Sequence, residues 1–188
     1  MEIFSAVDVF EDWEIALTNH ATFLAIAHTH YQEALALVKE RDGREVKIDA
    51  DADFNALKNA EIQRAAMIVV VFSALTLEAF INWYALEKFS RSFFKKHVDR
   101  LPIRRKWLEV PKRVVGKLIS AEVHKDITSL FNGRDELVHY KASKKRVKAL
   151  NEGENWVTEE HAHAAYETVK IAVAALKDAD DAVDIDCR

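Results

Sequence analysis

The run from Ala65 to Leu86, AAMIVVVFSALTLEAFINWYAL, is the most apolar stretch of the chain and constrains its fold most strongly. Four polar side chains interrupt it: Ser73, Thr76, Glu78 and Asn82. A charge in the middle of a membrane span costs roughly 2.5–3.5 kcal/mol, and the uninterrupted part is shorter than the roughly 20 residues that a span needs. A helix that is apolar on nearly every side is typical of the centre of a soluble core.

The β-branched cluster Ile68-Val69-Val70-Val71 leaves a buried strand as the alternative. Its Ala-rich and charged flanks contain no Gly or Pro, however, and this favours a long helix. Glu78 and Asn82 then lie four residues apart on one face. A glutamate inside a core helix needs a partner or a cleft, because burying an uncompensated charge is costly.

Composition favours one helical domain spanning residues 1–188. The chain is 49% hydrophobic, with only 4 Gly and 2 Pro, which argues against a fold of strands and tight turns. Its single cysteine, Cys187, excludes a disulfide or a cysteine metal site within one chain. The acidic N-terminal sequence lacks the basic and apolar regions of a signal peptide. We therefore expect a cytoplasmic protein without membrane association.

The net charge of -4 conceals an uneven distribution. From Arg100 to Leu150 there are 14 Lys and Arg against 5 Asp and Glu, a net of +9, so the rest of the chain carries -13. A basic segment in an acidic chain indicates an anionic partner such as nucleic acid. The alternative is that the basic segment packs beside the acidic remainder and neutralises it.

Hydrophobic periodicity predicts an all-α fold, an antiparallel bundle of about four long helices plus shorter ones. Gly43, Ser120 and Thr158 are expected at helix ends. Pro111 is expected to kink or split a helix. Asp42 to Phe54 is expected to form a polar connector, and the tail from Asp180 to fray. The predicted helices are Val7 to Arg41, Asn55 to about Val98, Ile103 to Leu118, Ala121 to about Lys141, and one that begins after Thr158.

No metal site is predicted. His20, His28 and His30 have no second ligand four residues away. The acidic run Asp49 to Asp53 lacks the glycine and the distal glutamate of a calcium-binding loop. We expect no cofactor.

The segment Asn132 to Lys141, NGRDELVHYK, holds the residues most suggestive of chemistry. A histidine such as His139 can move a proton near neutral pH. An arginine such as Arg134 stays charged and can hold a phosphate with two donors. The spacing alone is weak evidence, because Arg91 and His97 form a similar pair.

Three motifs in order resemble the HEPN superfamily: LTLEAFINWYA at 75–85, RKWLEVP at 105–111 and RDELVHYK at 134–141. The resemblance covers Asn59 to Lys141, with the final helix added by topology. In that family an Arg, a variable polar residue and a His four to six residues further on form the active motif. The resemblance implies a helical bundle that forms a homodimer through the motif-bearing face.

The resemblance also implies metal-independent cleavage of RNA, often by toxins paired with an antitoxin protein or by defence proteins. His139 would act as general acid or base and Arg134 would bind the scissile phosphate. The residue after the arginine, often Asn in the family, is Asp135 here and could orient His139. Glu78 or Asn82 could meet Arg134 across the bundle.

The geometry of a straight helix limits this motif, because five residues turn through roughly 140°. Arg134 and His139 therefore converge only through the long arginine side chain, a distortion at Gly133, or a second subunit. Downstream basic and aromatic residues are expected to bind RNA. These are Tyr140, Lys141, Lys144, Lys145 and Arg146.

The same residues also allow interpretations without catalysis. Arg134 and His139 could be solvated or paired with glutamates at a surface helix end. The basic run after Tyr140 could be a solubilising loop. The chain could then be a catalytically inactive HEPN-like module that dimerises or binds a partner, or a helical scaffold with no role in nucleic-acid binding.

Overall fold

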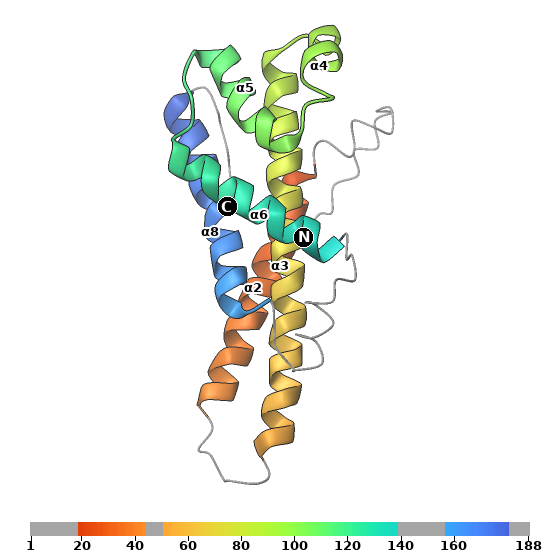
Figure 1. Ribbon diagram of the computed structural model, residues 1–188, viewed down its shortest axis with the longest axis vertical. Coiled ribbons are helices and arrows are strands. Elements are labelled where there is room, and N and C mark those ends of the chain that lie inside the picture. Colours follow the sequence, from red (N-terminus) through yellow and green to blue (C-terminus); the bar gives the residue numbers. More distant parts are fainter. Residues whose placement is uncertain (1–18, 44–50, 139–156, 181–188) are drawn as a thin grey trace, which may run out of the picture.

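A computed structural model describes residues 19–43, 51–138 and 157–180, and in these ranges it contains helices and no strand. The all-α prediction is confirmed. Helices α2, α3 and α8 run along the long axis, α6 crosses them, and α4 and α5 form one end (Figure 1). The helices are α2 His20–Asp42, α3 Asp51–Lys88, α4 Arg91–His97, α5 Ile103–Val115, α6 Ala121–Val138 and α8 Glu159–Ala179.

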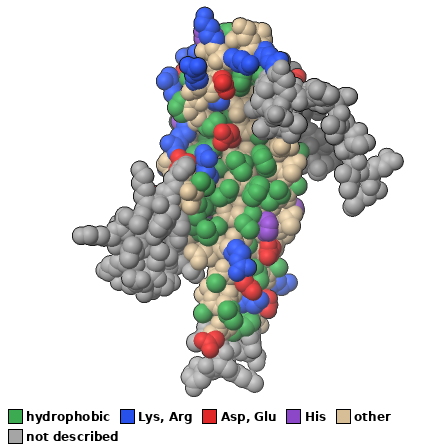
Figure 2. All heavy atoms as spheres, turned by 90° about the vertical axis from the view of Figure 1, so that its right-hand side faces the viewer, with side chains coloured by type: hydrophobic (Ala, Val, Ile, Leu, Met, Phe, Trp, Pro, Cys, Tyr) green, Lys and Arg blue, Asp and Glu red, His purple; other side chains and the backbone are tan. Residues whose placement is uncertain are grey.

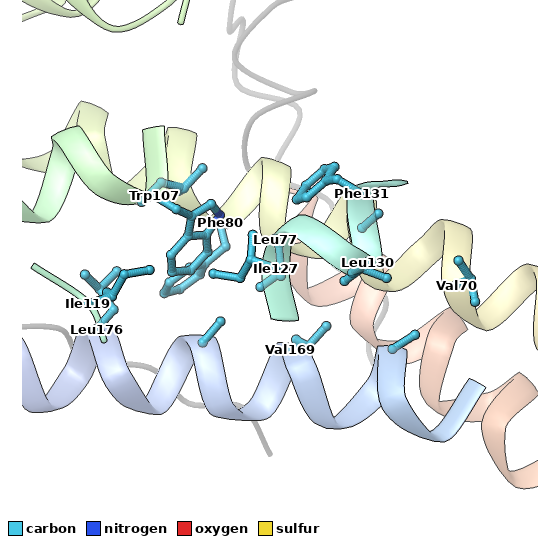
Figure 3. Close-up of a cluster of buried hydrophobic side chains, with 14 of the residues drawn as sticks. Val70, Leu77, Phe80, Trp107, Ile119, Ile127, Leu130, Phe131, Val169 and Leu176 are labelled. Atoms are coloured by element: carbon cyan, nitrogen blue, oxygen red, sulfur yellow. The ribbon is translucent and has the colours of Figure 1, made fainter. Parts of the chain in front are cut away.

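Helix α3 is the centre of the fold and contacts each of the other five described helices. By length and composition Asp53–Lys88 could span a membrane, but 67% of its most apolar window is buried inside the fold. It is therefore a core helix, as the sequence predicted, and the strand alternative for Ile68 to Val71 is excluded. Figure 3 shows how the labelled side chains of four helices meet in this core: Leu77 and Phe80 of α3, Trp107 of α5, Ile127 and Phe131 of α6, and Val169 and Leu176 of α8.

The predicted helix from Asn55 to Val98 is wrong at both ends. Helix α3 begins at Asp51 and stops at Lys88, and a separate helix α4 follows. The break comes at Ser90, whose extended backbone (φ -62°, ψ 149°) and side chain cap α4. The Ser90 hydroxyl accepts a hydrogen bond from the Phe93 amide at 3.3 Å, so it satisfies one of the amides that a helix start leaves unpaired.

Helix α5 begins after Pro102 and continues through Pro111 without splitting. It ends at Val115 rather than Leu118, because Gly116 adopts the left-handed conformation (φ 71°) that terminates helices. The predicted caps at Ser120 and Thr158 are confirmed. The Ser120 hydroxyl accepts from the Val123 amide at 3.2 Å, and Thr158 forms a capping box with His161.

The sequence predicted a fraying tail from Asp180 onwards, and this prediction is wrong for Asp180 itself. This residue is 8% exposed. The Tyr84 hydroxyl donates to Asp180 Oδ2 at 2.8 Å, and the Lys88 ammonium lies 2.8 Å from the same oxygen. These contacts fix the end of α8 against α3. The predicted start of the first helix before Asn19, the middle of the connector and the tail beyond Asp180 lie outside the described residues.

Candidate active site

Arg134 lies in the last turns of α6 and reaches α3. Its Nη2 lies 3.9 Å from Glu78 Oε2, and its Nε lies 3.1 Å from Asp135 Oδ1. The guanidinium carbon is 5.4 Å from the centroid of the Phe131 ring. The side chain is 22% exposed, so the cation is held against the helix by two carboxylates and a ring and still reaches the surface.

The Nε of Arg134 is buried and makes no hydrogen bond within the described part of the chain. Its 3.1 Å approach to Asp135 is therefore an ion-pair distance without hydrogen-bond geometry. Glu78 is 37% exposed, and pairs this exposed contribute only about 0–1 kcal/mol. Arg134 is thus positioned by contacts that are individually weak.

Asp135 joins α6 to α5 as well as lying beside Arg134. Arg104 Nη2 donates to Asp135 Oδ2 at 3.2 Å, and the Arg104 carbonyl is 3.0 Å from His124 Nε2. The carboxylate therefore has an arginine on each side. The two guanidinium groups compensate the negative charge of Asp135.

No hydrogen bond joins Asn82 to Arg134 in the described part of the chain. Asn82 accepts a hydrogen bond at 2.7 Å from Lys106 of α5. Lys106 is 4% exposed, and its ammonium lies 5.7 Å from the centre of the Phe94 ring. Burial lowers the pKa of Lys106, and the negative charges of Asp99 and Glu78 partly oppose this shift.

Sequence reasoning missed Lys106 as a part of this region. Its position offered a signal: Ile103, Trp107, Val110 and Val114 form an apolar stripe on α5, and Lys106 falls beside it. A lysine on an apolar stripe needs a partner in the core. The identity of that partner, Asn82, depends on how α5 packs on α3.

Several predicted site residues lie outside the described residues: His139, Tyr140, Lys141, Lys144, Lys145 and Arg146. Helix α6 runs through Gly133, whose φ is not positive. The suggested distortion there is therefore absent. Two of the three expected routes by which Arg134 could approach His139 are left: the length of the arginine side chain and a second subunit.

A pocket of about 570 Å³ lies between α6 and α8, and Arg134 is not among the residues that line it. Asn132, Gly133 and Glu136 line it from α6, and His161 and Thr168 line it from α8. Within residues 19–43, 51–138 and 157–180, no three His, Cys, Asp or Glu side chains gather as a metal site.

Comparison of the chain with models of known protein families, with characterised proteins and with solved structures gave no match. What the structure itself brings together is a polar chain across three helices. It runs from Lys106 and Asn82 in the core, past Glu78, to Arg134, Asp135 and Arg104 at the surface.

Proposed function

We propose that the protein is a metal-independent endoribonuclease of the HEPN type. The observation that carries this proposal is the placement of Arg134. Its guanidinium is held at the surface of α6 between Glu78 of α3 and Asp135, five positions before His139. The order of the three motifs along the chain, on α3, α5 and α6, supports the same proposal.

In the proposed reaction, the ribose 2′-oxygen attacks the adjacent phosphorus and loses its proton. The bond from phosphorus to the 5′-oxygen breaks, and that oxygen leaves with a proton. The products are a 2′,3′-cyclic phosphate and a 5′-hydroxyl. His139 carries a proton in one of these transfers, each worth roughly 10²–10⁴-fold in rate. Arg134 stabilises the charge that develops on the phosphate.

Binding of a phosphate to Arg134 requires little rearrangement. The Glu78 contact is long, at 3.9 Å, and partly exposed, so exchanging it for a phosphate costs little. A phosphate can accept two charge-assisted hydrogen bonds from arginine, whereas the Glu78 carboxylate lies beyond hydrogen-bond distance of Arg134. The balance therefore favours the substrate over Glu78.

We also propose that the protein acts as a homodimer through the face that carries Arg134. Val71 and Leu75 of α3 lie one to two turns before Glu78 and are half-buried. Figure 2 shows hydrophobic side chains gathered over the middle of one face. A second copy covering such a surface would supply a second Arg134 and His139. A role as a toxin or defence protein, with an antitoxin protein as partner, goes with this proposal.

A second candidate function is a catalytically inactive HEPN-like module that binds a partner. One observation favours it. Glu78 and Asp135 both approach Arg134, so the cation is already compensated by charges of its own chain. In that case Arg134 serves to fasten α6 to α3, and the chain binds RNA or protein without cleaving it.

The experiment that separates these functions is incubation of the purified full chain with a mixed-sequence RNA in EDTA. A matched substrate with 2′-deoxyribose throughout serves as control, because it lacks the proposed nucleophile. Cleavage of the RNA alone, with cyclic phosphate ends, supports the nuclease. An RNA that stays intact, or cleavage of both substrates, would contradict it.

A further inference from the structure

The end of the molecule formed by α4 and α5 is strongly basic. Residues 88–117 contain eleven Lys and Arg against two Asp and Glu, a net charge of +9. Figure 2 shows Lys and Arg side chains gathered over this end. Concentrated charge of one sign opposes folding by self-repulsion, and an anionic partner offsets it.

Four of these residues form what we call the basic track: Lys96, Arg100, Arg104 and Arg105. Lys96, Arg100 and Arg105 are exposed, and Arg104 is half-buried. Arg105 is 65% exposed, and its ion pair with Glu109 is long, at 3.8 Å. Such a pair holds the guanidinium only weakly.

The connection between α4 and α5 keeps the track compact. The Leu101 amide donates to the Val98 carbonyl at 2.9 Å, and the Arg105 amide donates to the Pro102 carbonyl at 2.8 Å. Four residue steps span at most about 14 Å, so Arg100 lies within that distance of Arg104 along the backbone. A bonded turn between two helices is a defined platform rather than a loose tail of charges.

The track leads to the candidate active site. Arg104 Nη2 lies 3.2 Å from Asp135 Oδ2, and Arg134 Nε lies 3.1 Å from the other oxygen of the same carboxylate. Asp135 therefore bridges Arg104 of the track and the arginine proposed to hold the scissile phosphate.

Three aromatic rings, Phe89 before α4 and Phe93 and His97 on it, accompany these charges, and we call them the ring column. Phe89 and Phe93 also pack against the core, so the His97 end is the part that faces solvent. The Phe89 and Phe93 ring centroids are 4.8 Å apart, and those of Phe93 and His97 are 4.7 Å apart. His97 is exposed, and Phe93 is half-buried. Surfaces that bind single-stranded nucleic acid combine a positive groove with aromatic faces on which bases stack. Because cations and the ring column lie side by side, single-stranded RNA fits this surface better than an anionic partner that binds through charge alone.

We propose that the basic track, with the ring column ending at His97, binds single-stranded RNA and leads its backbone to Arg134. The inference rests on the proposed nuclease function for the identity of the RNA as substrate. It places the main RNA-binding surface on α4 and the start of α5, in addition to the basic run after Tyr140.

The test measures binding of a short fluorescent single-stranded RNA to full-length His139→Ala protein at several salt concentrations in EDTA. The proposal assigns proton transfer to His139, so the RNA should stay intact in this background. A Lys96→Gln/Arg100→Gln variant removes two charges from the track. The matched control, Lys170→Gln/Lys177→Gln, removes two exposed charges from α8.

We expect the track variant to bind RNA on the order of tenfold more weakly than its background and to lower the salt slope by about 1.4, because each lost phosphate contact to a single strand contributes about 0.7. The control should retain the affinity and slope of its background. Adding His97→Leu should weaken binding further through lost stacking, by at least about fivefold. Equal affinity of the two double variants would overturn the proposal. So would track-dependent binding to anionic phospholipid vesicles with no binding to RNA.

Failure of this inference is distinguishable from failure of the nuclease. A wild-type chain that binds RNA through the track without cleaving it would remove the nuclease and keep the binding surface. If the wild type cleaves RNA and the track variant binds RNA as tightly as its background, the binding surface is refuted and the nuclease proposal stands.

Discussion

The Lys106 ammonium donates to the Asn82 side-chain oxygen at 2.7 Å inside the bundle, and this bond joins α5 to α3. Asn82 lies one turn after Glu78, so the bond fixes the stretch of α3 that faces Arg134. Both partners are less than 10% exposed. A charged donor at this depth depends on its acceptor, because water cannot replace it.

Removing the acceptor should therefore destabilise the fold. Asn82→Leu leaves the Lys106 ammonium buried without this acceptor and should cost about 2–3 kcal/mol in the free energy of unfolding. Adding Lys106→Met replaces the charge by an apolar side chain and should restore most of that loss. Urea unfolding of the two single variants and the double variant measures the coupling. Losses that simply add would show that the pair has no energetic connection.

Gly133 and Gly116 should respond in opposite directions to alanine. A Cβ at Gly133 would lie 3.8 Å from Val70 Cγ1, an ordinary contact, so Gly133→Ala should stabilise α6 by about 0.5–1 kcal/mol. Gly116 has φ 71°, and Gly116→Ala should cost about 1 kcal/mol through left-handed strain. The unfolding midpoints of both variants test this, and a shift of the same sign in both would refute it.

His20 should make the fold less stable in mild acid. Its ring lies against Phe80 and Trp83, with centroids at 5.6 and 5.2 Å, and burial lowers its pKa below the ordinary value of 6.5. The unfolded chain then binds a proton before the folded chain does. Stability should fall as the pH drops through about 6.5 towards the lower folded pKa.

The measurement is the urea midpoint at pH values from neutral to 5.5, compared between the wild type and His20→Phe. The variant should lose part of the acid sensitivity, whereas His97→Gln, which removes an exposed histidine, should retain it. An unchanged pH dependence in His20→Phe would count against this assignment.

The sequence predicts helix type well in this chain, because long apolar runs without Gly or Pro have few alternatives. The central helix is found for this reason, and the caps at Ser120 and Thr158 are found because Ser and Thr side chains accept from helix-start amides. The break at Ser90 escapes prediction, since no Gly or Pro marks it and a serine side chain alone closes one helix start. The sequence assigns Asp180 to an acidic tail, because its partners, Tyr84 and Lys88, are far away in sequence.

The candidate site shows the same division between local and tertiary information. Spacing identifies Arg134 as a residue of interest, and its place on α6 follows from local helix signals. The contact of Asp135 with Arg104, 31 residues earlier in the chain, depends on how α5 packs against α6. A single sequence carries no direct record of such packing, so this contact and the Lys106 bond became visible only in three dimensions.

The most direct test of the central claim compares RNA cleavage rates in EDTA for wild type, Arg134→Ala, His139→Ala and His30→Ala. His30 lies on α2, with its Nδ1 2.6 Å from Glu33 Oε2, and serves as a matched histidine control. We predict chelator-resistant cleavage by the wild type and the His30 variant, and a loss of at least about 10²-fold in the other two. An RNA that the wild type leaves intact, or equal cleavage by all four proteins, would contradict the assignment of Arg134 and His139.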